Sequence, residues 1–261
     1  MSITTQQVNV LGSRVSLLSV EEAVFQLEAW IELREPRCRQ VVVTGFHGLW
    51  EAHRDAEFFR IVNGADLWVP DGIAPVLIAR ARGIRGARRV PGAELMEAFL
   101  AKADFAGYRS FFYGDTDETL ARLKDTVEQK YPGHVVAGTF SPPFGAVSPE
   151  EDAEHVRRIN AAGPDVLWVG LGTPKQDRWI HEHLDRLDVP VAAGVGAAFR
   201  FLTGQVRRAP TWVGRLGLEW AYRLANEPRK CWHRCFVQGP QFLGHVLLEM
   251  AGKSSSRPNA N

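Results

Sequence analysis

Short apolar runs alternate with helical patterns along most of the chain. A capping box at Ser19 and Glu22 opens a helix whose apolar residues recur at helical spacing, and a β-rich run follows over residues 40–45. Further strands are predicted over residues 66–72, 108–113, 134–139, 165–171 and 189–195. This alternation is typical of a parallel sheet wrapped by helices, so we predict an α/β protein with an open, mostly parallel sheet flanked by helices.

Capping residues set the expected helix bounds. One helix is predicted over residues 48–64, and Asp115 with Glu118 is predicted to cap another. Ser148, with Pro149 at the first helical position and Glu151 three residues after Ser148, is predicted to cap a third.

The pattern changes near Gly204. Beyond it, residues 212–225 and 232–251 are predicted as two helices with no strand between them, interrupted at Pro228 and at Gly239-Pro240. Residues 207–234 hold seven Lys or Arg and two Glu, interleaved with Trp and Tyr. Such a segment is an ordinary amphipathic core helix or one that lies on an anionic lipid surface. Binding of nucleic acid is a third interpretation, which the acidic remainder of the chain disfavours. We therefore predict a basic C-terminal helical appendage.

Composition narrows the class of protein. The formal net charge of +1 over 261 residues argues against a nucleic-acid binder. The three cysteines form no even disulfide framework, and Cys231, His233 and Cys235 lack the paired spacing of zinc sites, so no metal is expected. The polar residues 1–9 and the absence of a run of about 20 apolar residues lead us to expect neither a signal peptide nor a bilayer-spanning helix. We expect a cytoplasmic protein with only peripheral membrane contact, and a homo-oligomer stays open.

A candidate phosphate site follows one predicted strand. Thr173-Pro174-Lys175-Gln176 comes directly after an apolar run that ends in Gly172. A helix that begins there offers free backbone N–H groups and a partial positive charge at the carboxyl end of a strand. A capping box with Thr173 as the N-cap explains the same residues except Lys175, so both interpretations stay open.

Three other features carry possible chemistry. Asp71 ends a predicted strand and is either a turn residue or a general base in a cleft at the strand ends. Gly194 and Gly196 resemble a truncated dinucleotide fingerprint, although a tight turn explains them better. Arg89 closes a run of five arginines over residues 80–89, which is a solvated face or contains a clamp for a pyrophosphate.

Several motifs occur together in a fixed order. They are Val69-Pro70-Asp71-Gly72, Arg89-Val90-Pro91-Gly92, Tyr131-Pro132-Gly133, residues 170–176, residues 194–196, Arg208-Ala209-Pro210 and residues 218–224. Over roughly residues 8–235 the chain resembles the WecG/TagA/CpsF family of bacterial glycosyltransferases, and the ordered set is far more specific than any one motif.

The resemblance implies a fold, a reaction and partners. It implies a Rossmann-like enzyme that moves a sugar, with inversion and without a cofactor or essential metal, from a UDP-sugar to a sugar on a polyprenyl pyrophosphate lipid. The reaction would serve bacterial cell-surface polysaccharides at the inner face of the plasma membrane. Residues 1–204 would form the nucleotide-sugar-binding catalytic domain and residues 205–253 the membrane-docking appendage. Residues 254–261 are small and polar, and we predict them to be disordered.

The same resemblance suggests residue roles. Asp71 matches the catalytic base, Thr44 a hydroxyl beside it, and Arg89 an arginine that stabilises phosphate. The remaining substrate-binding candidates are Gly172, Thr173, Lys175, Gln176, Gly194, Gly196, Arg200, Arg208, Arg215 and Arg223.

Two positions depart from the family pattern. Phe46 stands where many members have Asn, and His47 beside it is expected to substitute for the missing amide. Arg200 stands where many members have Asp, which suggests an acidic sugar such as a uronic acid. These departures leave open a non-catalytic, membrane-docked subunit of a polysaccharide assembly complex. Separately, Gly194 and Gly196 leave open an NAD-dependent oxidoreductase.

Overall fold

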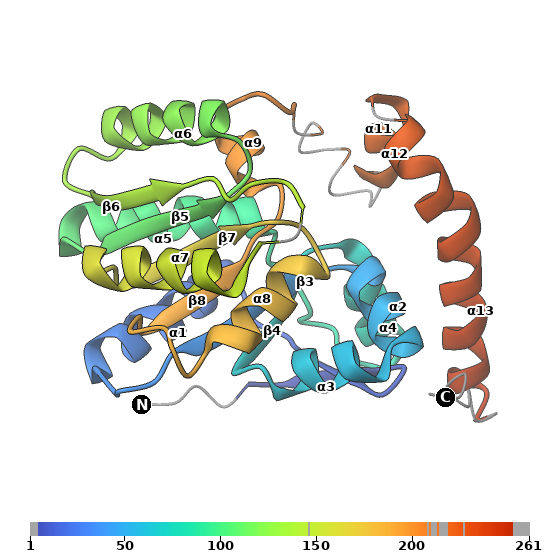
Figure 1. Ribbon diagram of the computed structural model, residues 1–261. Helices are drawn as coiled ribbons and strands as arrows, with labels where there is room; N and C mark the ends of the chain where they lie inside the picture. The colour runs from blue at the N-terminus through green and yellow to red at the C-terminus, as the bar shows by residue number, and fades with distance from the viewer. Residues whose placement is uncertain are drawn as a thin grey trace.

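The computed structural model describes residues 5–145, 147–207, 209, 213, 219–226 and 228–252. A parallel six-stranded sheet lies between two layers of helices (Figure 1). The strand order is β4-β3-β8-β7-β5-β6, and every neighbouring pair is parallel. The strands are β3 (Arg39–Thr44), β4 (Leu67–Pro70), β5 (Arg109–Gly114), β6 (Val135–Phe140), β7 (Val166–Gly170) and β8 (Val191–Gly194). The predicted α/β class is confirmed.

Alternate residues of the buried strands face opposite helix layers, because successive side chains point to opposite faces of a sheet. Val41 and Val43 belong to the core beneath one helix layer, whereas Val42 belongs to the core beneath the other. The first layer contains α1 (Val20–Leu33), α5 (Gly92–Ala106), α6 (Asp117–Lys130) and α9 (Ala198–Leu202). The second contains α2 (Phe46–Arg54), α3 (Ala56–Gly64), α4 (Ile73–Ala81), α7 (Pro149–Ala162) and α8 (Lys175–His183).

A small antiparallel hairpin near the N-terminus was not predicted. Strands β1 (Gln7–Val10) and β2 (Ser13–Ser16) pair around a turn in which Leu11 and Gly12 both have positive φ. Its valines alternate with polar residues and join the core that also contains Trp68 of β4. The alternation signals a strand, but each run is only four residues long and gives little periodicity.

Two of the predicted helix caps are confirmed, and two other predictions about helix starts are wrong. The boxes at Ser19 and at Ser148 are confirmed. The single helix predicted over residues 48–64 is wrong, because the Asp55 side chain accepts hydrogen bonds from the next helix and separates α2 from α3. Asp115 does not cap α6 either. Thr116 is the N-cap, and Asp115 has a φ of 59° and faces Arg200.

From Glu219 to Met250 the described C-terminal residues are helical. They form α11 (Glu219–Asn226), α12 (Pro228–His233), the π-helical turn η1 (Arg234–Gln238) and α13 (Gly239–Met250). The break predicted at Gly239-Pro240 is wrong, since Pro240 occupies the first turn of α13, where its missing N–H is not needed. The predicted tail, residues 254–261, lies outside the described residues, and the boundary near Gly204 remains a prediction.

Helix α13 packs against α2. Phe242 and Val246 are buried in the core that contains residues of α2, and the Phe46 and Phe242 ring centroids are 5.8 Å apart. His53 Nε2 lies 3.2 Å from His245 Nδ1. Among the helices that the structure describes, none combines the length and apolar character needed to span a bilayer.

Candidate active site

Four of the predicted site residues, Asp71, Thr44, Gly172 and Gly194, lie at one edge of the sheet. Strands β4, β3, β8 and β7 are consecutive neighbours, and parallel strands bring their carboxyl ends to the same edge. Asp71 follows β4 directly, Thr44 ends β3, Gly194 ends β8 and Gly172 follows β7. Residues that lie more than a hundred positions apart in sequence therefore border one surface.

Asp71 is held in a fixed orientation. Its Oδ1 accepts a hydrogen bond of 3.0 Å from the backbone N–H of Gly92, the first residue of α5. Its own N–H donates to the carbonyl of Thr44 at 3.2 Å. The partial positive charge at the start of α5 stabilises a carboxylate in this place. The half-buried Asp71 is therefore suited to accept a proton at the strand ends.

Glycines allow the ends of β3 and β4 to approach each other. A Cβ on Gly48 would lie 2.3 Å from Thr44 Oγ1, so the buried Thr44 side chain fits only because this position in α2 has none. A Cβ on Gly45 would lie 3.3 Å from the backbone nitrogen of Gly72. Thr44 thus lies beside Asp71 through the backbone, and its side chain is packed beneath the first turn of α2.

The segment before α5 connects β4 to β8. Val90 N–H donates to the Pro70 carbonyl at 2.8 Å, which brings the half-buried Arg89 to the end of β4. A Cβ on Gly92 would lie 3.1 Å from the carbonyl oxygen of Val195. Helix α5 therefore begins in close contact with the turn after β8, and Asp71 and Arg89 border the same edge as Gly194.

Gln176 ties together the turns that follow β7 and β8. Its Oε1 accepts hydrogen bonds from the N–H of Gly172 at 3.0 Å and from the N–H of Gly196 at 2.9 Å. Gln176 is 1% exposed, and the two glycines have φ values of 80° and 57°, in the region that favours glycine. We call this arrangement the Gln176 clasp.

The clasp overturns the capping box predicted at Thr173. Helix α8 begins at Lys175 with Pro174 as its N-cap, and no side chain caps it. The start of α8 also offers fewer free backbone N–H groups than predicted, because the Gln176 N–H donates to the Gly172 carbonyl. The Gly196 amide donates to Gln176, so the dinucleotide fingerprint lacks an N–H that a pyrophosphate would need. Lys175 is exposed, whereas the half-buried Thr173 interacts through its hydroxyl with the Asp177 carboxyl.

His47 connects the site to the C-terminal helices. Burial, followed by the positive charge of Arg234, lowers the pKa of His47 to about 4, and a hydrogen bond with Gln238 only partly opposes this. Its Nδ1 lies 3.7 Å from Glu51 Oε1. The imidazole is therefore neutral near pH 7, and its partners lie along α2 and on η1.

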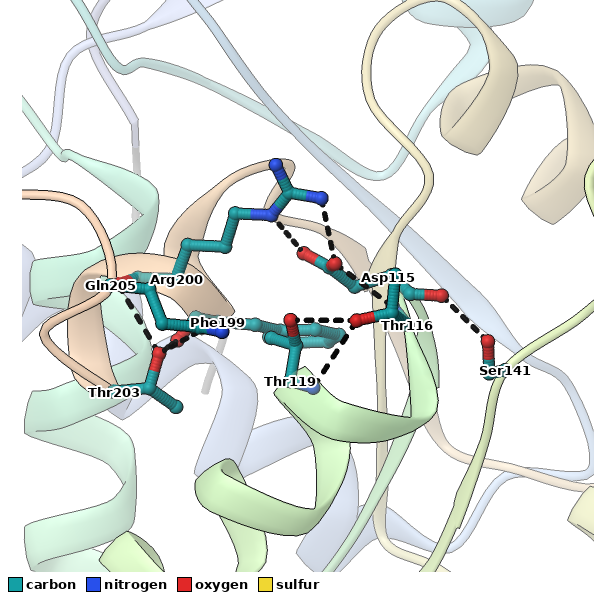
Figure 2. A network of polar contacts seen from close by, with 8 residues as sticks. All are labelled: Asp115, Thr116, Thr119, Ser141, Phe199, Arg200, Thr203 and Gln205. Carbon is teal, nitrogen blue, oxygen red and sulfur yellow. Dashed lines mark hydrogen bonds and ion pairs between the residues drawn. The ribbon is translucent and has the colours of Figure 1, made fainter.

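Arg200 has a partner within the chain (Figure 2). Its Nε and Nη2 both donate to the Asp115 carboxylate at 2.8 Å. Burial raises the pKa of Asp115, but the hydrogen bonds from Arg200 and from the Thr116 N–H outweigh it and leave the pKa below its usual value. The Ser141 hydroxyl donates to the Asp115 carbonyl at 2.7 Å and anchors the same turn. Because Asp115 already balances the charge of Arg200, the expectation of an acidic sugar loses its basis.

Replacing Arg200 with Met should destabilise the protein by about 2 kcal/mol near pH 7, because it leaves the Asp115 carboxylate buried without its charged partner. The pKa of Asp115 is lowered in the folded protein, so the stabilisation exists above the unfolded pKa and disappears as the pH falls through the folded one. Urea unfolding of both proteins at pH 7 and at strongly acidic pH measures this. An equal difference at both pH values would contradict the assignment.

Two of the predicted arginines, Arg208 and Arg215, lie outside the described residues. Arg223 belongs to α11. Within the described part of the chain, no three His, Cys, Asp or Glu side chains are grouped as metal ligands would be.

Sequence reasoning missed two groups in and behind this edge. One is the Gly92 amide, although the Pro91-Gly92 pair that starts α5 was a visible signal. The other is Asp177, which is fully buried and shares a helix face with Ile180 and His183, so its helical spacing marked it as an inward-facing polar residue.

Comparisons with known proteins agree on one family. The model of the glycosyl transferase WecG/TagA/CpsF family matches residues 8–256. An N-acetylglucosaminyldiphosphoundecaprenol N-acetyl-beta-D-mannosaminyltransferase of Bacillus spizizenii is 32% identical over 210 residues, which cover 80% of this chain and 78% of that protein. The Bacillus subtilis protein of the same name is 30% identical over 79% of this chain and 78% of its own length, and the one from Staphylococcus aureus is 31% identical over 64% and 63%.

The family match extends across both the strand-end site and the described C-terminal helices. The motifs that suggested the family in the sequence supply Asp71, Arg89 and the Gln176 clasp, which the fold brings to one edge. This chain is therefore a glycosyltransferase of the WecG/TagA/CpsF family.

Proposed function

We propose that the protein transfers a sugar from a UDP-sugar to a sugar carried on polyprenyl pyrophosphate, with inversion, in the synthesis of a bacterial cell-surface polysaccharide. The observation that carries the proposal is the Asp71 carboxylate, held by the Gly92 N–H at the edge where open α/β sheets bind nucleotides. The names of the relatives, which describe transfer to a diphosphoundecaprenol-linked sugar, support the acceptor class.

In the proposed reaction Asp71 is the general base. It takes the proton of an acceptor hydroxyl while that oxygen attacks the anomeric carbon of the donor. The bond from the anomeric carbon to the UDP oxygen breaks as the new glycosidic bond forms, and UDP leaves with the electron pair. One displacement inverts the anomeric configuration, and Asp71 finishes the step protonated.

The departing UDP gains negative charge, which nearby cations would stabilise. Arg89 borders the same edge as Asp71, and Lys175 is exposed at the start of α8. We assign both to the pyrophosphate, with Thr173 as a neighbouring contact and with Arg208, Arg215 and Arg223 as contributions from the appendage. Gly172, Gly194 and Gly196 would let the donor approach the backbone. His47 would position the C-terminal helices through its hydrogen bond with Gln238.

We further propose that the C-terminal helices hold the protein on the anionic inner face of the plasma membrane, where a polyprenyl-linked acceptor resides. Phe236 in η1 is 63% exposed and Leu247 in α13 is 57% exposed. Trp232, Leu243, Leu248 and Met250 are also exposed in these helices. Apolar and aromatic side chains of this kind enter the interface of a bilayer, and basic residues nearby add attraction to anionic lipids.

Replacing Phe236 and Leu247 together with Ser should lower binding to anionic vesicles at least tenfold, because each apolar side chain that enters lipid contributes about 1.5–3 kcal/mol. Liposome flotation measures this. Phe105→Ser is the matched control, since Phe105 is 91% exposed at the end of α5 and should not change flotation. Equal flotation of the double variant and the unchanged protein would remove the appendage as the anchor.

The function itself is tested by UDP release from a panel of UDP-sugars that includes UDP-N-acetylmannosamine, with and without a short prenyl-pyrophosphoryl-N-acetylglucosamine acceptor. The proposal predicts acceptor-dependent release from one donor, equal in EDTA and in Mg²⁺. UDP release at the same rate with and without the acceptor would indicate a hydrolase. Binding of UDP-sugar without release from any donor would favour a non-catalytic subunit.

A further inference from the structure

A carboxyl group lies in the interior behind the strand-end site. Asp177 is 0% exposed and belongs to the first turn of α8. Neither of its carboxyl oxygens has a hydrogen-bond partner of normal geometry among the described residues, and the same holds for Oε1 of the buried Gln40 on β3. Unsatisfied buried oxygens are rare in folded proteins, so this pair requires a physical explanation.

Asp177 and the Gln176 clasp share one contact surface. A Cβ on Gly194, the last residue of β8, would lie 2.8 Å from Gln176 Nε2 and 2.9 Å from Asp177 Oδ1. The carboxyl and the amide therefore both rest against the same glycine. Gln40 Nε2 donates to the backbone carbonyl of Asp177 at 2.8 Å and joins β3 to this group.

The surroundings favour the neutral acid. Burial raises the pKa of Asp177 to about 7, and weaker interactions with the Thr173 hydroxyl, its own backbone and the Gln176 side chain oppose that rise. The strands packed here present Gln40 and Gly194, which carry no charge. On α8 itself, Lys175 and His181 are exposed. Arg178 of α8 is paired with Asp55 and Glu57 at the start of α3.

We propose that Asp177 is a positioning residue of the donor site. Its neutral carboxyl holds the side-chain amide of Gln176 in the orientation that binds the turns after β7 and β8. A protonated carboxyl keeps one oxygen that can accept from the Gln176 amide, since both groups rest against Gly194, and it exchanges the buried charge for a donor. An ionised carboxylate would instead place a charge at a fully buried position beside the clasp, where the cost of burial outweighs the interactions with Thr173 and Gln176.

The inference rests on the proposed function only in so far as those turns bind the UDP donor.

It predicts that the hydrogen bonds of the Gln176 clasp persist in Asp177→Asn, which is neutral and of the same shape, and are lost in Asp177→Ala. Asp185→Asn, an exposed aspartate just after α8, is the matched control.

Two measurements on the full chain test this. Amide hydrogen exchange should quicken at least tenfold at residues 171–176 and 194–198 in Asp177→Ala and stay unchanged in Asp177→Asn at pH 6. Calorimetry with UDP should show about tenfold weaker binding by Asp177→Ala. Between pH 6 and pH 8 the unchanged protein should lose more affinity for UDP than Asp177→Asn does. UDP itself titrates in the same way in both experiments, so its contribution cancels in this comparison.

Unchanged exchange in Asp177→Ala, or the same pH dependence of UDP binding in the unchanged protein and in Asp177→Asn, would overturn the proposal. If Asp177→Ala does not fold, the comparison with Asp177→Asn across pH still decides it. If the unchanged protein does not bind UDP at all, the proposed function fails, and the exchange data alone then decide the role of Asp177.

Discussion

Replacing Asp71 with Asn should lower turnover by about 10²–10⁴-fold, the usual contribution of a general base, and leave the affinity for UDP nearly unchanged. The Asn side chain keeps an oxygen that can accept the Gly92 N–H, so the strand end should hold its shape. The amide cannot take the acceptor proton. Steady-state rates with a saturating UDP-sugar, together with UDP calorimetry, measure the two quantities separately.

The control for this substitution is Asp125→Asn, which changes an exposed aspartate in α6 and should leave turnover unchanged. Turnover of the Asp71 variant at the unaltered rate would show that another group accepts the proton. Loss of UDP binding together with turnover would instead place Asp71 in the donor pocket.

Replacing Gln176 with Leu should have the second largest effect, because one substitution removes the acceptor of two N–H groups. Gly172 and Gly196 would each lose a hydrogen bond, and an unsatisfied buried N–H costs about 1–3 kcal/mol. We expect the free energy of unfolding to fall by about 2–4 kcal/mol and the KM for the donor to rise at least tenfold. Urea unfolding and donor titrations at fixed acceptor measure both.

Gln129→Leu, at an exposed position of α6, controls for the general effect of exchanging an amide for an apolar side chain. A Gln176 variant of normal stability would mean that the two glycine amides find other acceptors. Normal stability with a raised donor KM would instead make Gln176 a direct ligand of the donor.

Much of the fold was predictable, because local chemistry determines it. Apolar runs such as residues 166–170 identify buried parallel strands, and the boxes at Ser19 and Ser148 mark helix starts through contacts within four residues. The break at Asp55 and the continuous passage through Pro240 were missed. In both cases a turn residue is compatible with two local structures, and packing decides between them.

The site was predictable as a set of positions but not as a set of contacts. Strand ends placed Asp71, Thr44 and the glycines at one edge, since parallel strands share their direction. The direction of the Gln176 side chain depends on Gly196, which comes twenty residues later. Arg200 meets Asp115 across 85 residues, and charge alone suggested an external acidic partner. Where a side chain can bind either a local or a distant partner, only the tertiary structure shows which partner it binds.

The chemistry of transfer is most directly tested by the anomeric configuration of the product. Transfer from an α-linked UDP-sugar to a prenyl-pyrophosphoryl-sugar acceptor, followed by NMR measurement of the one-bond C1–H1 coupling of the new glycosidic bond, distinguishes one displacement from two. With Asp71 as the base of a single displacement, the new bond is β. An α-linked product would contradict that mechanism and require a covalent intermediate or a different catalytic group.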